Sequence, residues 1–469
     1  MAKFGGQLAS WCITLVVIRL LVPGDYGLMA MATVIMGLLT MIAEMGFGAS
    51  LVQAVRFDVE GLRRLSGATL LINLAFMGVL FAAAPLVAHL YAEPRLAAVI
   101  HVTCLQFALN AFAVIPDALL RRAMRFRALS LIEIGSGLAG NASTLALALT
   151  GHGVWSLVFG ALVTTAVRTG VLQLMHPLRA TPRFSWVGAL GMVRFGAGVT
   201  TTRIFSYFSN QADMLVGGRL LGREALGIYS VALHLATLPM QRVSSVINDV
   251  AFAAFAQIQA DSAGVSRNLL LAIRLLAFLS FPTLWGIAAV TPEIVGLALG
   301  ERWSDVVTPM QIIALAVPLR MVGTILATCR LSVGRVDLST WTALVALIIT
   351  PLVYIVAVRW GVLGLALAWA GLSPLHFVLC AWGSRTSLAT RWAQILAAAA
   401  PSALAAGIML FVVLVARSAV DAWPVLAQLC VLALLGAAVY VLASLLLNRR
   451  TFREAMELLR PGHSAKASL

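Results

Sequence analysis

The chain is a succession of long apolar stretches, each about as long as a helix needs to cross a lipid bilayer. Hydrophobic residues make up 61% of its 469 positions and charged residues only 11%, against roughly 25% charged residues in typical soluble chains. A water-soluble fold cannot cover that much apolar surface. Because a helical span takes about 20 apolar residues, the composition predicts a polytopic membrane protein and excludes an ordinary cytoplasmic enzyme.

The apolar stretches end at turn residues or charge clusters, which separate about fourteen predicted spans. The stretches are continuously apolar and do not alternate, so a transmembrane β-barrel is excluded. The predicted spans are 4–22, 26–52, 65–91, 96–119, 129–150, 152–175, 190–218, 224–248, 268–290, 308–330, 339–358, 361–382, 395–417 and 424–447. The predicted fold is therefore an all-α transmembrane helix bundle.

The distribution of basic residues predicts the orientation in the membrane. The chain has 33 Lys and Arg residues against 18 Asp and Glu, and alternate loops carry most of the bases. The base-rich set comprises Arg56, Arg63, Arg64, Arg121, Arg122, Arg125, Arg127, Arg179, Arg183, Arg267, Arg335, Arg385 and Arg391, with Arg449, Arg450, Arg453, Arg460 and Lys466 in the tail. The positive-inside rule places these loops and both termini in the cytoplasm, which requires an even number of spans. No soluble basic face exists to bind a nucleic acid.

A short sequence pattern occurs twice with a constant offset of 200 residues. Arg19-Leu20-Leu21, Gly27 and Ala32 recur as Arg219-Leu220-Leu221, Gly227 and Ala232. Each copy closes one predicted span and opens the next, six spans apart, which predicts two parallel six-helix lobes related by an axis along the membrane normal. The predicted parts are an N-lobe over 1–186, a C-lobe over 187–382, two further spans over 383–447 and a basic amphipathic cytoplasmic tail over 448–469.

Polar side chains form stripes on the seventh and eighth predicted spans. At 100° per residue, each set shares one face of its helix. The first stripe comprises Arg203, Ser206, Asn210 and Asp213, bordered by Tyr207, and the second comprises Ser230, His234, Thr237, Gln241, Ser245 and Asn248. Two adjacent polar faces predict a shared hydrated cavity, although hydrogen bonding within a tight bundle would produce a similar pattern.

An excess of arginine inside the spans indicates which charge the cavity attracts. An ionised side chain at mid-bilayer costs roughly 2.5–3.5 kcal/mol on insertion scales, and arginine presents a planar fork that matches phosphate oxygens. The candidate arginines for an anionic ligand are Arg203, Arg320, Arg274 and Arg168. A structural ion pair or an interfacial position is the alternative for each of them. The acids Asp213, Glu44, Glu133 and Asp249 would either bind a coupling cation or pair with arginine.

No motif for bond-making chemistry is present in the sequence. It contains no Walker loop, no HExxH zinc helix and no GxSxG elbow. The five cysteines lie in apolar runs without a CxxC pair, which indicates small buried residues. We therefore expect a transporter without a metal or cofactor.

Two segments resemble a known family. The stretch Ile18-Arg-Leu-Leu-Val-Pro-Gly-Asp-Tyr-Gly27 with Glu44-Met-Gly-Phe-Gly-Ala-Ser-Leu-Val-Gln53, and Asn210-Gln-Ala-Asp213 through Arg219-Leu-Leu-Gly222 with Leu226-Gly-Ile-Tyr-Ser230, are similar to Wzx-type polysaccharide flippases. These belong to the multidrug/oligosaccharidyl-lipid/polysaccharide exporter superfamily. The chain departs from the family pattern at Ile18, where alanine is usual, and at Glu44, where aspartate is usual. It also begins almost inside the first span, the pattern expected of a truncated or misassigned start.

The resemblance implies twelve core helices in two lobes, often with two more helices at the C-terminus. It implies alternating access around a cationic cavity and transfer of an undecaprenyl-pyrophosphate-linked oligosaccharide to the periplasmic leaflet of a bacterial inner membrane. Membrane lipids and a polysaccharide polymerase or export machinery are the implied partners. The motif residues that carry over as family or gate positions are Arg19, Asp25, Gly27, Asp213, Arg219 and Gly227.

Three other functions remain alternatives at the level of sequence. A multidrug or cation antiporter of the same superfamily would need acid-rich lobes, which the arginine excess disfavours. A flippase for the peptidoglycan precursor would use a similar architecture with a narrower cargo. A membrane-embedded polymerase or ligase would need a sizeable periplasmic loop, and the sequence shows none.

Overall fold

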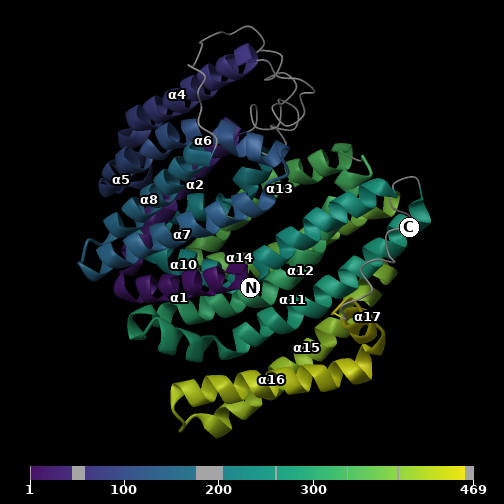
Figure 1. The fold of residues 1–469 in the computed structure, drawn as a ribbon. Coiled ribbons are helices and arrows are strands. Elements are labelled where there is room, and N and C mark those ends of the chain that lie inside the picture. The colour runs from purple at the N-terminus through teal and green to yellow at the C-terminus, as the bar shows by residue number, and fades with distance from the viewer. Residues whose placement is uncertain are drawn as a thin grey trace. The chain divides into compact units, whose positions relative to one another are not determined.

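A computed structural model describes residues 2–44, 59–175, 204–258, 261–334, 336–387 and 390–459. Within these ranges every secondary-structure element is a helix (Figure 1). The predicted all-α class is confirmed. The chain divides into two compact units, Met1–Ser230 and Val231–Leu469. The predicted boundary between residues 186 and 187 lies outside the described residues, so the four-part division stays a prediction.

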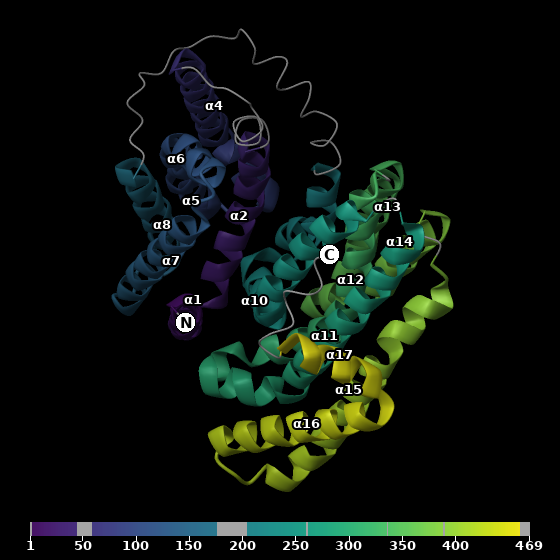
Figure 2. The same ribbon diagram turned by 45° about the vertical axis from the view of Figure 1, so that its right-hand side comes forward.

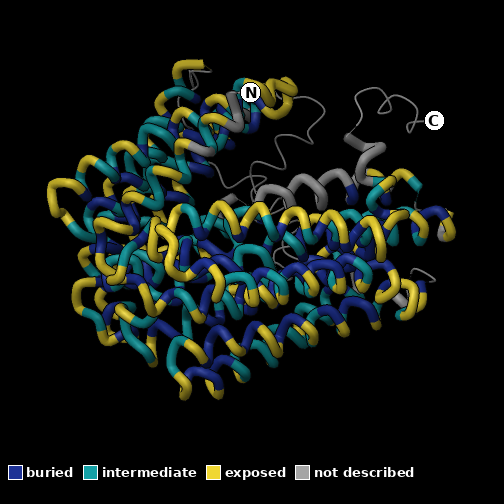
Figure 3. Tube along the Cα trace, turned by 90° about the horizontal axis from the view of Figure 1, so that it is seen from below, coloured by how far each residue is buried: buried dark blue, intermediate teal, exposed yellow. Residues whose placement is uncertain are grey.

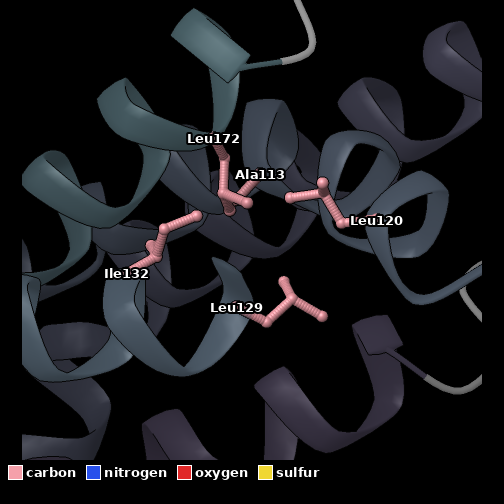
Figure 4. Packing of buried hydrophobic residues seen from close by; sticks show 5 residues of the cluster. All are labelled: Ala113, Leu120, Leu129, Ile132 and Leu172. Carbon is pink, nitrogen blue, oxygen red and sulfur yellow. The ribbon is translucent and has the colours of Figure 1, made fainter. Parts of the chain in front are cut away.

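The first unit is built around helices that lie along one another. Its helices are α1 (Ala2–Leu20), α2 (Pro23–Glu44), α4 (Val59–Tyr91), α5 (Arg95–Thr103), α6 (Leu105–Arg122), α7 (Phe126–Leu149), α8 (Val154–Met175) and the start of α10 (Ala212–Gln257). Helix α7 packs along α8 and α1, and α6 packs on α8 and α4. Figure 4 shows side chains from α6, α7 and α8 converging in one cluster, formed by Ala113, Leu120, Leu129, Ile132 and Leu172.

Helices α7 and α8 approach each other at two glycines. A Cβ atom built on Gly140 would overlap the Thr164 hydroxyl, and one built on Gly160 would overlap the Thr144 hydroxyl. Both threonines donate a 3.0 Å hydrogen bond to a glycine carbonyl of their own helix, Thr144 to Gly140 and Thr164 to Gly160. Small residues of this kind let helix backbones pack closely where lipid offers no hydrophobic driving force between helices.

The second unit is assembled around α11. Its elements are the remainder of α10 from Val231, α11 (Ser262–Ala298), η1 (Glu301–Val306), α12 (Val307–Ser332), α13 (Val336–Ala357), η2 (Val358–Trp360), α14 (Gly361–Ser387), α15 (Trp392–Val420), α16 (Val425–Leu447) and α17 (Arg449–Leu459). Helix α11 packs against α12, α15 and α16, and α12 packs along α14. Both ribbon views show α15 beside α16 (Figures 1 and 2).

Polar side chains tie these neighbours to α11. The Trp285 indole donates a 3.1 Å hydrogen bond to the Leu315 carbonyl of α12. From α16, the Tyr440 hydroxyl donates a 2.8 Å hydrogen bond to the Phe278 carbonyl. From α15, Arg417 forms a 2.9 Å ion pair with Glu293.

The helices have the length and surface of membrane spans. Within the described part of the chain, 9 helical segments are long and apolar enough to cross a membrane. One of them, Leu338–Gly383, contains both α13 and α14, and so corresponds to two predicted spans. Exposed and buried positions interchange along the helices (Figure 3), and large apolar side chains such as Leu174 are up to 83% exposed. The chain is a multi-pass membrane protein, consistent with about fourteen spans.

Glycine turns confirm the two shortest predicted links between spans. Gly151 and Gly153, with φ of +79° and +55°, separate α7 from α8, and Gly361, with φ of +67°, follows η2 and opens α14. The predicted span 96–119 lies within one segment long and apolar enough to cross a membrane, Arg95–Arg122, in which helices α5 and α6 meet at Cys104. There the Thr103 hydroxyl donates a 2.8 Å hydrogen bond to the Val99 carbonyl, a bond that commonly bends helices.

The glycine contact between α7 and α8 predicts a specific loss of stability. A Gly160→Leu substitution forces the two backbones apart, and overpacking of this kind costs roughly 1–3 kcal/mol. We expect a Tm in detergent several degrees below that of the unmodified protein. Gly170→Leu on the same helix is the matched control, because a Cβ at Gly170 meets no atom within 4 Å. An equal fall in Tm for both variants would contradict this account.

Candidate functional site

The two copies of the repeated pattern form helix-to-helix junctions, as predicted. In the first copy, α1 ends at Leu20 and α2 begins at Pro23, whose fixed φ suits the first position of a helix. In the second copy, α10 is interrupted at Gly222, with φ of +80° and ψ of −179°. This backbone conformation is not helical, so it divides α10 into two helices. Glycine adopts it readily, whereas other residues rarely do.

The two junctions contact each other reciprocally through glycine. A Cβ atom on Gly27 would overlap the carbonyl oxygen of Arg223, and a Cβ atom on Gly227 would overlap the carbonyl oxygen of Pro23. The partners Pro23 and Arg223 are themselves separated by the repeat offset of 200 residues. Each copy therefore offers the same glycine and the same carbonyl to the other, which is the geometry of a local two-fold contact.

Charged side chains surround this glycine contact. The Arg223 guanidinium lies 3.6 Å from the Glu93 carboxylate, with both side chains partly exposed. The stem of Arg223 passes Gly24, where a Cβ atom would lie 3.4–3.6 Å from three of its atoms. The Asp25 carboxylate faces the turn at Gly153. The motif arginines Arg19 and Arg219 are exposed near the helix ends.

Asp213 is a buried structural acceptor in this structure. Its side chain is 1% exposed, and it accepts hydrogen bonds of 2.6 Å from the Tyr229 hydroxyl and 2.8 Å from the Met214 amide. Nearby, the Tyr207 hydroxyl donates a 2.6 Å hydrogen bond to the Val34 carbonyl of α2. Asn210 is exposed, whereas Arg203, the remaining charged member of the predicted stripe, lies outside the described residues.

Two of the predicted cavity arginines have carboxylate partners. Arg168 on α8 forms a 2.8 Å ion pair with Asp117 of α6, and the second oxygen of Asp117 accepts a 2.6 Å bond from Arg121. Arg274 on α11 makes a two-pronged pair with Glu454 of α17, at 2.9 and 3.0 Å. Both arginines therefore form structural ion pairs, which was the alternative to ligand binding in the sequence analysis.

Arg274 also belongs to the contact that anchors the tail helix. Glu454 accepts a second, 3.1 Å bond from Arg450 of its own helix. Beside this pair, the rings of Phe278 and Phe452 meet edge to face with centroids 6.2 Å apart. Helix α17, the described part of the predicted tail 448–469, therefore packs on α11.

The face between α12 and α14 gathers cationic and polar side chains. The Arg320 guanidinium lies 4.5 Å from the ring centroid of Trp369, a cation–π geometry. Arg330 is completely buried. Its Nη1 donates a 3.3 Å hydrogen bond to the Cys380 carbonyl, and its Nε has no hydrogen-bond partner in the described structure. Gly323 leaves room for the His376 imidazole, and Gly383 leaves room for the Arg330 guanidinium.

Arg330 is the residue that the sequence analysis missed. It follows Arg320 by ten residues, which places the two side chains within about 80° of each other on one face of α12. Arg330 is the last residue of the predicted span 308–330 and was counted neither among the loop bases nor among the candidate arginines, although its helical register with Arg320 was the available signal.

The other predicted site residues are less informative. Glu133 and His234 are exposed. Glu44 ends α2, and Gln241 and Asp249 lie in α10, but their side chains are outside the described structure. The described residues contain no group of three or more His, Cys, Asp or Glu side chains arranged to hold a metal ion.

The docking of α17 predicts a measurable change in local opening. Hydrogen bonds to charged groups contribute roughly 1.5–3 kcal/mol, so Arg274→Gln is expected to accelerate amide exchange across 449–459 by about tenfold or more. Glu454→Gln should have the same effect, and combining the two should add little. Arg267→Gln, an exposed arginine on the same helix, is the control. Unchanged exchange in the Arg274 variant would contradict the anchor.

Comparisons with known proteins show similarity to proteins of polysaccharide biosynthesis. WzxC of Escherichia coli, a lipopolysaccharide biosynthesis protein, is 27% identical over 331 residues, which cover 69% of this chain and 66% of that protein. The succinoglycan biosynthesis transport protein ExoT of Rhizobium meliloti is 30% identical over 288 residues, covering 61% and 58%. The chain thus matches about two thirds or less of the length of these two relatives.

Solved structures share the fold. The lipid II flippase MurJ in an inward closed conformation superposes with a TM-score of 0.77 at 16% identity, covering 97% of this chain and all of that one. An inward-facing multidrug resistance transporter of the MATE family gives a TM-score of 0.63 at 15% identity, covering 84% and 95%. The family model described as polysaccharide biosynthesis protein matches residues 16–308. The chain therefore belongs to this family of polysaccharide biosynthesis proteins.

Proposed function

We propose that the protein is a flippase that moves undecaprenyl-pyrophosphate-linked oligosaccharide units from the cytoplasmic to the periplasmic leaflet of a bacterial inner membrane. Its products would supply exopolysaccharide or lipopolysaccharide synthesis. Family membership and the names of the relatives support polysaccharide transport in general. The finer statement rests on the cationic face between α12 and α14.

The buried cation Arg330 carries the proposal. A charge removed from water is costly unless a counter-charge or a full set of hydrogen bonds compensates it. Among the described residues Arg330 has no carboxylate partner, and one of its nitrogens has no hydrogen-bond partner. A fold under no functional constraint would place an apolar residue here. An anionic cargo explains why a cation is retained beside Arg320 and His376.

Pyrophosphate is the group that this face suits. It keeps its negative charge throughout transfer, and guanidinium groups bind phosphate oxygens through two parallel N–H bonds. Arg320 is partly exposed, so it would make first contact, with Arg330 as the second cation along α12. Arg203, Tyr207, Asn210, His234 and Gln241 remain predicted contributors. Arg274 and Arg168 would take part only by exchanging their present carboxylate partners for the cargo.

The remaining parts of the proposal follow from the arginine distribution and the resemblance. Both termini would be cytoplasmic, and a polymerase or export machinery would receive the cargo. The drug antiporter is disfavoured by the absence of a carboxylate near Arg330 in the described structure. A flippase for the peptidoglycan precursor shares the fold of MurJ. It would show lethality on depletion, whereas loss of a surface polysaccharide alone supports the proposal.

The test begins with the lipid-linked sugar pool in a deletion strain. A membrane-impermeant periodate or lectin probe sorts this pool by leaflet. We expect undecaprenyl-pyrophosphate oligosaccharide to accumulate on the cytoplasmic side while the surface polymer is lost. A normal pool with a normal polymer would overturn the proposal in a strain without a second flippase gene.

Complementation of that strain tests Arg320. A charge-assisted contact to phosphate contributes roughly 1.5–3 kcal/mol, so Arg320→Gln should lower polymer export by about tenfold or more. Arg302→Gln, an exposed arginine of η1, is the matched control and should export normally. Normal export by the Arg320 variant would remove this residue from the site.

Arg330 allows function to be separated from stability. Replacing a buried ionic group by an apolar residue of similar volume is often neutral or stabilising. Arg330→Met should therefore keep or raise the Tm of the purified protein while lowering export. A variant with a lowered Tm and normal export would show that Arg330 has a structural role only.

A further inference from the structure

Helices α13 and α14 border an open groove of about 580 Å³ in the second unit. Its lining is apolar and includes Val356 of α13 and Leu367 of α14, which are 53% and 55% exposed. Gly371 keeps the groove open, because a Cβ atom there would meet no atom within 4 Å. Pockets of roughly 300–1,000 Å³ accommodate ligands of drug size, so the groove has room for a single lipid chain.

The groove covers the depth of one leaflet of a bilayer. Along the start of α14, its lining residues extend from Trp360, the last residue of η2, to Gly371. A helix rises about 16 Å between these two positions, which is roughly half of a hydrocarbon core about 30 Å thick. Trp360 is 66% exposed, and tryptophan is enriched at the interface between membrane and water. The groove therefore runs from one interface to about the middle of the bilayer.

A cation lies at the interfacial end of the groove. Arg359 directly precedes Trp360 in η2 and is exposed. No carboxylate in the described part of the chain forms an ion pair with it. A guanidinium binds phosphate oxygens through two parallel N–H bonds. The groove and its cation thus match the two parts of a phospholipid, an apolar chain and a phosphodiester.

The groove lies on the opposite face of α14 from Arg320 and Arg330. Its lining residues on α14 recur at i, i+3, i+4 and i+7 and so share one face; they are Gly364, Leu367, Ala368 and Gly371. Trp369, which contacts Arg320, points about 150° away from the centre of that face at 100° per residue. A cargo chain in the groove would lead its pyrophosphate away from both arginines. The geometry therefore favours a lipid of the bilayer as the occupant.

A second copy of the chain fits the groove less well than a lipid. Gly364 and Ala368 have the small-xxx-small spacing that lets helices pair in membranes. The close approach at Gly364 is already made within the chain, however, because a Cβ atom there would overlap the Ala357 carbonyl oxygen. The space that remains beside this contact suits a flexible chain.

We propose that the groove between α13 and α14 binds an anionic phospholipid of the leaflet that contains Arg359. One acyl chain lies along α14 toward Gly371, and Arg359 holds the phosphodiester. Phosphatidylglycerol suits the site better than phosphatidylethanolamine, whose own ammonium group lies beside its phosphate and competes with the guanidinium. The positive-inside rule assigns this leaflet to the periplasmic side. The inference goes beyond the proposed function and does not depend on it.

Native mass spectrometry of the purified full-length protein tests the lipid preference. Phosphatidylglycerol and phosphatidylethanolamine with identical acyl chains are titrated separately. A hydrogen bond to a charged group gives a factor of about ten or more, so the first phosphatidylglycerol should bind with a Kd lower by that factor. Arg359→Gln should remove the difference between the two lipids. Arg302→Gln should retain it, because this exposed arginine lies in η1, between α11 and α12.

Two outcomes of these titrations would overturn the proposal. One is an equal Kd for both lipids in the unmodified protein. The other is a preference for phosphatidylglycerol that persists in the Arg359→Gln variant.

Filling the groove tests the place of the acyl chain. Gly371→Leu adds a side chain into open space, so the protein should fold, which its Tm verifies. Both lipids should bind about tenfold more weakly, since displacing two buried methylene groups is enough for that factor. Gly78→Leu on α4 is the matched control, because Gly78 is also exposed and a Cβ there also meets no atom within 4 Å. Unchanged lipid binding in the Gly371 variant would contradict the assignment.

A photoactivatable lipid locates the chain directly. Phosphatidylglycerol with a diazirine at the end of one acyl chain should label peptides from residues 352–371 on irradiation. Labelling confined to other peptides would overturn the site. So would a protein dimer that Gly371→Leu dissociates, which would assign the groove to a second copy. These measurements involve no cargo, so failure of the proposed function appears separately, as a deletion strain that keeps its polymer.

Discussion

Close approach of helix backbones at glycine is the constraint on which this structure depends. Inside a bilayer, apolar side chains gain little by leaving lipid for one another, so helices associate through packing and hydrogen bonds. Glycine provides the required closeness between α7 and α8, and again between the two repeat junctions. Within the second unit, glycines on α12 and α14 make space for an imidazole and a guanidinium. The same small residue thus serves close helix packing, the contact between the two repeat junctions and the accommodation of polar groups.

The arginines within the helices fall into two physical classes. Arg168, Arg274 and Arg417 each face a carboxylate on a neighbouring helix, which neutralises their charge and ties helices together. Arg330 is buried without such a partner in the described structure, and Arg320 rests against an aromatic face. Charges of the first class explain assembly, whereas those of the second are the ones that we propose bind the anionic cargo.

Much of the fold follows from the sequence because its physical signals are local. Apolar length determined the spans, and glycine-rich turns marked the links at Gly151 and Gly361. The candidate site was harder to predict. Helical periodicity shows which residues share a face but not which helix lies opposite. The partner of Arg274 is Glu454, 180 residues away, and nothing in either segment indicates the other. The burial of Arg330 likewise depends on how α14 packs.

The reciprocal junction has a consequence for how the two copies of the repeated pattern can differ in sequence. Each half contributes a glycine and a carbonyl oxygen to the contact, and a carbonyl oxygen is present whatever the side chain. Substitution is therefore constrained at Gly27 and Gly227 but permitted at the positions that face them, where one half now has Pro23 and the other Arg223. Relatives should retain the two glycines together or lose them together, while the residues opposite them drift.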